Sequence, residues 1–60
     1  QNEKIYYVSI DDQQLGPYDL NKIRSLIQLN KVNSETLIWK EGMKEWDSSK
    51  NIIEIKKLLY

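Results

Sequence analysis

The hydrophobic positions near the start of the chain follow a period of two. Residues 4–10 (KIYYVSI) are rich in β-branched and aromatic types, which predicts a strand. One face of this strand carries Tyr6, Val8 and Ile10, and the other carries Ile5, Tyr7 and Ser9. The polar residues 11–14 predict a turn, after which Leu15 resumes a short extended stretch that ends at Gly16-Pro17.

The pattern then changes to the period of a helix over residues 20–29. Asp19 is a suitable N-cap, because its carboxylate can accept from backbone N–H groups at the positive end of the helix dipole. Asn30 tolerates a positive φ and is suited to the C-terminal end. Leu29 lies off the apolar stripe of the helix. That stripe, the inward face, consists of Leu20, Ile23, Leu26 and Ile27.

The second half of the chain predicts a hairpin and a short helix. Residues 36–40 and 43–46 flank Glu41-Gly42, a two-residue connection ending in Gly, and are expected to form two antiparallel strands. Asn51 and Glu54 have the spacing of a capping box, which predicts a helix to about Leu59. The inward residues of this helix are Ile52, Ile55, Leu58 and Leu59.

These elements give the order β, α, β, β, α and predict an α+β fold, in which a small antiparallel sheet packs against a helix. Sixty residues make one compact domain at most, and we place it at residues 4–60. The chain has no Cys, so packing alone must form the core. Trp39 and Trp46 are the largest apolar groups; Trp46 is expected in the core, while core and surface stay open for Trp39.

Charge and chain ends narrow the classes of partner. Nine basic residues balance nine acidic ones, which argues against nucleic acid as a partner, since nucleic-acid binders usually gather a basic excess on one face. Apolar runs are short, so we expect no direct membrane insertion by this segment. The chain begins with Gln1 and not with Met, and we expect it to be a fragment of a longer protein.

The residues that usually carry catalysis are missing. The chain has neither His nor Cys, and its glycines do not form a phosphate-binding loop. The residues Asp11 and Asp12 are adjacent in a polar turn, and solvated carboxylates are poor acid–base catalysts at neutral pH. We therefore expect no enzyme activity, no catalytic residue, no cofactor and no metal site.

The residues Gly16-Pro17-Tyr18 are the best candidate for a binding surface. A Gly-Pro turn held between a strand and a helix cap has little freedom, and it would present the Tyr18 ring to a proline or another apolar side chain. Alternatively, Tyr18 is the hydrophobic staple residue before the Asp19 cap and packs against the helix. The sequence leaves both roles open.

The run from Tyr6 to the end of the chain resembles the GYF domain family, in its bacterial-type second branch. The resemblance rests on Gly16-Pro17-Tyr18 and on the W-x-x-G-M-x-x-W pattern, which is formed by Trp39, Gly42, Met43 and Trp46. It implies a protein-interaction module that docks extended, proline-containing peptides in an aromatic groove. It also implies a cytoplasmic location, or one on the cytoplasmic face of a membrane with a membrane-associated parent protein.

When the family's peptide-binding pattern is aligned with this chain, most of its aromatic positions are occupied by aliphatic residues. Tyr18 keeps the ring of the Gly-Pro-aromatic turn, whereas most other groove positions lack one. We therefore expect a retained scaffold with an altered ligand choice, an apolar or proline-containing peptide segment. The expected binding residues are Val8, Ile10, Leu15, Gly16, Pro17, Tyr18, Leu26 and Lys31.

Two other functions stay open beside peptide docking. In the first, the groove is vestigial and the domain associates with itself or packs against its parent protein; Leu29, Ile53 and Tyr60 lie off the helical stripes and would suit such a surface. In the second, Lys4, Lys31 and Lys40 gather on one face and bind nucleic acid.

Overall fold

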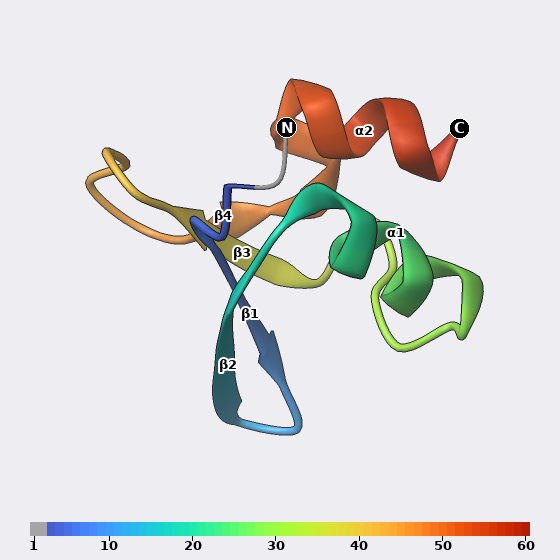
Figure 1. The fold of residues 1–60 in the computed structure, drawn as a ribbon, viewed down its shortest axis with the longest axis horizontal. Coiled ribbons are helices and arrows are strands. Elements are labelled where there is room, and N and C mark those ends of the chain that lie inside the picture. Colours follow the sequence, from blue (N-terminus) through green and yellow to red (C-terminus); the bar gives the residue numbers. More distant parts are fainter. Residues whose placement is uncertain (1–2) are drawn as a thin grey trace.

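The computed structural model describes residues 3–60 and shows a four-stranded sheet with helices on one face (Figure 1). Strands β1 (Tyr6–Ile10) and β2 (Gln13–Tyr18) form an antiparallel hairpin. Asp11 and Asp12 make its turn with φ values of 52° and 63°, the left-handed conformation of a two-residue hairpin loop. The extended stretch expected around Leu15 is thus a full strand, which adds a β element before the first helix.

The rest of the sheet extends from the other edge of β1. Strand β3 (Leu37–Lys40) pairs antiparallel with β1, and β4 (Asp47–Ser48) pairs with β3, giving the order β2-β1-β3-β4. The α+β class and the antiparallel sheet are therefore confirmed.

The strand expected at residues 43–46 is wrong, because these residues form a loop that folds back on the end of β3. The backbone N–H of Met43 donates to the Lys40 carbonyl at 2.9 Å, and the Trp39 indole N–H donates to the Met43 carbonyl at 2.8 Å. The first bond closes the Glu41-Gly42 turn, but the Met43 carbonyl that a paired strand would offer to the Lys40 N–H accepts the Trp39 indole, and the Lys40 N–H donates to Met43 Sδ at 3.3 Å. The ladder therefore does not continue through residues 43–46, and β3 pairs again only from Asp47.

Helix α1 (Leu20–Gln28) follows the sequence prediction closely. The backbone N–H of Lys22 donates to the Asp19 carboxylate at 2.8 Å, which confirms the N-cap. Asn30 has a φ of 62°, as expected for the residue that ends the helix. The chain then turns so that the N–H groups of Lys31 and Val32 both donate to the Leu26 carbonyl. This turn brings Val32 back into the core.

The C-terminal part consists of a 3₁₀ turn, η1 (Ser49–Asn51), and helix α2 (Ile53–Leu59). The capping box is wrong, since the residue before α2 is Ile52 and no side chain caps the helix. The Asn51 amide instead donates to Asp47 at 2.9 Å. The Glu54 carboxylate accepts from the Tyr6 hydroxyl at 2.7 Å and from Lys40 Nζ at 2.9 Å. Both side chains find partners outside the helix.

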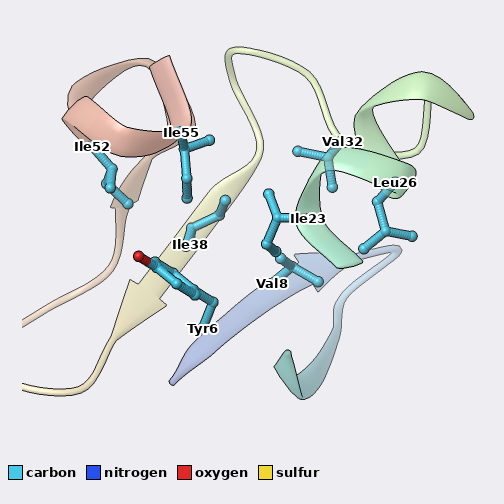
Figure 2. Close-up of a cluster of buried hydrophobic side chains, with 8 residues drawn as sticks. All are labelled: Tyr6, Val8, Ile23, Leu26, Val32, Ile38, Ile52 and Ile55. Atoms are coloured by element: carbon cyan, nitrogen blue, oxygen red, sulfur yellow. The ribbon is translucent and has the colours of Figure 1, made fainter. Parts of the chain in front are cut away.

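The core lies between the sheet and the two helices (Figure 2). Val8 and Ile38 point from the sheet toward Ile23 of α1 and Ile55 of α2, and all four side chains have no exposed area. The cluster is completed by Tyr6, Leu26, Val32 and Ile52. Ser49 is the buried polar residue beside it, and its hydroxyl donates to the Thr36 carbonyl at 2.8 Å.

The opposite face of the sheet carries an aromatic pair. Tyr7 alternates with the core residues of β1, Trp39 alternates with Ile38, and their ring centroids are 5.5 Å apart. Trp39 and Trp46 are both half-buried, and neither belongs to the core cluster or to the residues packed against it, so the expectation of a core role for Trp46 is wrong.

Candidate functional site

A groove lies where the end of β2 meets the first turns of α1. It has a volume of about 480 Å³. We call it the Tyr18 groove, and it is lined by Lys4, Pro17, Tyr18, Asp19, Asn21, Lys22 and Ser25. Most of these side chains are exposed, whereas Tyr18 and Asp19 are half-buried. The groove is thus an accessible surface at the Gly-Pro-Tyr turn.

The backbone of Gly16 fixes the turn that forms one wall of this groove. Gly16 has a φ of 141°, and a Cβ atom added there would lie 2.7 Å from the Tyr6 carbonyl oxygen and 3.0 Å from Tyr7 Cδ2. The pairing of β1 and β2 is irregular between Tyr6 and Val8, opposite this point. Close approach of the two backbones therefore requires glycine, and it sets the position of Pro17.

Tyr18 both packs against the core and lines the groove. It pairs with Tyr6 across the hairpin and packs against the core cluster, as a staple residue would. The rest of its ring lines the groove, where Lys22 Nζ lies 5.6 Å from the ring centroid. The ring is consequently held in place from behind while one part of it faces solvent.

The charges of the groove come from three side chains. Lys4 and Lys22 are both exposed, and α1 has no acidic residue in its first turn. The Asp19 carboxylate is engaged as the N-cap, where it accepts the N–H of Lys22. Its negative charge lies at the positive end of the helix dipole. The charges at the outer rim of the groove are therefore mainly those of the Lys4 and Lys22 ammonium groups.

The other expected binding residues lie outside the Tyr18 groove. Val8 has no exposed area and Leu26 is 7% exposed, because both point into the core. Ile10 and Leu15 are half-buried on the β1–β2 hairpin and pack against that core. Lys31 is exposed beyond the end of α1. The structure therefore brings Pro17 and Tyr18 together next to Gly16, and none of the other five expected residues lines the groove.

Sequence reasoning did not identify Lys4, Asn21, Lys22 or Ser25 as part of the site. The helical period could have indicated two of these residues, because Lys22 and Ser25 lie on the polar side of α1, shortly after Tyr18 in the sequence. Lys4 joins the groove only because β1 and β2 are paired, and no local pattern reveals that.

A second polar cluster holds α2 to the sheet. Its members are Tyr6, Lys40 and Glu54, linked by the two hydrogen bonds to the Glu54 carboxylate. Burial and the bond to Glu54 raise the pKa of Tyr6 well above its ordinary range. Burial alone would raise the pKa of Glu54, but the bonds from Lys40 and Tyr6 outweigh it and hold this pKa below its usual value. A fully protonated tyrosine and an ionised carboxylate fit a structural role.

Residues 3–60 contain no group of three or more His, Cys, Asp or Glu side chains placed to hold a metal ion. None of the helices in that range is long and apolar enough to cross a membrane.

Comparison with known proteins supports the sequence resemblance. The family model described as GYF domain 2 matches residues 6–55, from the start of β1 to the middle of α2. The match includes the Gly-Pro-Tyr turn, α1 and the Trp39–Trp46 loop. No curated protein sequence matches the chain. Because the family model covers most of the chain, the protein belongs to the GYF domain 2 family.

Proposed function

We propose that this domain is a protein-interaction module that docks an extended peptide, apolar or containing proline, in the Tyr18 groove. Membership in a family of GYF domains, which act as interaction modules for peptides, supports the general function. The observation that carries the specific site is the half-exposed ring of Tyr18, held between the core and a groove of about 480 Å³.

Binding of a peptide in this groove costs little conformational entropy. The position of Pro17 is set by the close approach at Gly16, and Tyr18 is anchored against the core, so little freedom is lost when a peptide binds. An extended proline-containing segment is also preorganised, and its flat rings suit an aromatic face. The site can therefore bind without rearrangement of the backbone.

The remaining expected residues fit the proposal in two different ways. Ile10, Leu15 and Lys31 keep exposed area and are proposed as secondary contacts for a peptide that extends beyond the groove. Val8 and Leu26 lie in the core, and their proposed contribution is to support the hairpin and α1 from behind. Binding without catalysis is the proposed activity, and no nucleic acid is proposed as a partner. The proposed cytoplasmic location rests on the resemblance alone.

A backbone amide NMR titration tests the proposal. Two capped peptide pools are compared, one rich in proline and one apolar without proline, and the amide signals of Tyr18, Lys22 and Ser25 are followed. We expect shifts at these residues with at least one pool. The proline pool would indicate that proline selection survives, and the apolar pool alone would indicate a changed ligand class.

Two tryptophan variants on α1 locate the binding site. Ser25→Trp places a bulky ring in the groove, while Arg24→Trp places the same ring on an exposed position outside it. The proposal requires that Ser25→Trp removes the shifts at Tyr18 and that Arg24→Trp leaves them. Equal binding by both variants, or no shifts at millimolar peptide in the wild type, would overturn it.

Self-association is the second candidate function. Leu29, Ile53 and Tyr60 are 64%, 69% and 83% exposed, and none of them lines the Tyr18 groove. Sedimentation over a range of protein concentrations distinguishes this candidate. A concentration-dependent dimer that is lost in Ile53→Lys or Leu29→Lys supports it, and a monomer at all concentrations opposes it.

A further inference from the structure

We infer that the peptide bound by the Tyr18 groove is acidic, with a carboxylate close to the residue that contacts the Tyr18 ring. This inference rests on the proposed peptide-docking function and names the chemistry of its partner. It is drawn from the charges around the groove and from the position of the Lys22 side chain.

Two cations border the groove without a carboxylate partner. The ion pairs found within residues 3–60 are Lys40 with Glu54 and Lys50 with Glu35, so Lys4 and Lys22 have no carboxylate oxygen within 4.0 Å. They come from different segments, the stretch before β1 and helix α1, and both line the groove. A peptide lying across Tyr18 therefore passes near two unpaired ammonium groups.

The one acidic side chain in the lining is already engaged. Asp19 accepts the Lys22 backbone N–H at 2.8 Å and lies at the helix N-terminus. Arg24 adds a further positive charge on α1, whose residues include no Asp or Glu. The local field thus favours an anionic partner over a cationic one.

The position of Lys22 makes the preference more specific. Its Nζ lies 5.6 Å from the centroid of the Tyr18 ring, within the range of a cation–π contact. A proline or apolar side chain that stacks on this ring competes with the ammonium group for the same surface. A carboxylate next to the stacking residue would accept the displaced ammonium group, whereas a Lys or Arg in the peptide would repel it. Lys22 is thereby assigned as a specificity-determining residue.

Three matched peptide pools test this assignment. Each contains capped nine-residue peptides with varied apolar and proline positions, and a fixed Asp, Asn or Lys two residues after a central proline. Affinities are measured from the amide shifts of Tyr18 and Ser25 at low salt. We expect the Asp pool to bind about threefold to tenfold more tightly than the Lys pool, with the Asn pool between them.

Charge reversal on α1 provides the matched control. Lys22→Glu should reverse the order of the Asp and Lys pools, and it should leave the fold intact because an acidic side chain is favourable in the first turn of a helix. Arg24→Glu changes the net charge equally on an exposed position outside the groove and should keep the order. An equal effect of both variants would mean a general charge effect and would overturn the role of Lys22.

The acidic preference and the peptide-docking function are refuted by different results. If all three pools shift Tyr18 with equal affinity, the groove binds peptides but the acidic preference is wrong. If no pool shifts Tyr18, the peptide-docking function itself is wrong, and the inference fails with it.

Discussion

Substitution of Gly16 by Ala tests whether the groove is built on the close approach of the two hairpin strands. The added Cβ would lie 2.7 Å from the Tyr6 carbonyl oxygen, a contact with backbone that cannot easily move. Gly42 offers a matched control, because its φ is also positive, 103°, and an added Cβ there has no atom within 4 Å. The two variants share the conformational cost of a side chain at positive φ and differ in the steric overlap.

The expected magnitudes follow from these two terms. A non-glycine residue at such a φ costs about 1–3 kcal/mol, and overlap in a well-packed region adds about 1–3 kcal/mol. Gly42→Ala should therefore lower the free energy of unfolding by about 1–3 kcal/mol, and Gly16→Ala by about 2–6 kcal/mol. A domain of 60 residues has a total of roughly 3–9 kcal/mol. Gly16→Ala should accordingly lose a large part of the stability of the domain.

Urea unfolding followed by the fluorescence of Trp39 and Trp46 measures both variants, since both indoles are half-buried in the folded state. The reasoning predicts that Gly16→Ala is less stable than Gly42→Ala by about 1–3 kcal/mol. Equal stabilities within about 0.5 kcal/mol would refute the claim that this site excludes a side chain.

Two further predictions concern the Glu54 cluster and the first hairpin turn. Because the folded-state pKa of Glu54 is lowered, its contribution is present above the pKa of the unfolded chain and is lost as the pH falls through the folded-state pKa. Thermal unfolding between about pH 6 and pH 3 should therefore show a smaller loss of stability for Glu54→Gln than for the wild type. Asp12→Gly removes the conformational cost of a non-glycine residue at a φ of 63°, and it should raise the free energy of unfolding by about 0.5–1 kcal/mol. An unchanged or lower urea midpoint for Asp12→Gly would contradict that reasoning.

The sequence predicted the elements whose signals are local. The two faces of β1 and the apolar stripe of α1 follow from hydrophobic periodicity, and the cap at Asp19 follows from a bond to a residue three positions away. Elements that depend on distant partners were harder to predict. Glu54 has the spacing of a capping residue, yet it bonds to Tyr6, which lies 48 positions earlier in the chain. Asn51 likewise bonds to Asp47 and does not cap α2.

The candidate site likewise combines residues with a local sequence signal and residues that only the fold brings in. Gly16-Pro17-Tyr18 stands out in the sequence because glycine and proline restrict the backbone in characteristic ways. Val8 and Leu26 could not be separated from a surface role without the fold, since an aliphatic residue on a strand or helix faces either the core or a groove. Lys4 enters the site only through the pairing of β1 with β2.

Intermolecular nuclear Overhauser effects between the labelled domain and a bound peptide test the central claim most directly. Aromatic rings that a peptide could contact lie at the Tyr18 groove and, on the face of the sheet away from the core, at the Tyr7–Trp39 pair. The account predicts contacts from peptide proline or aliphatic protons to the Tyr18 ring. Contacts confined to Tyr7 and Trp39, with none at Tyr18, would contradict it.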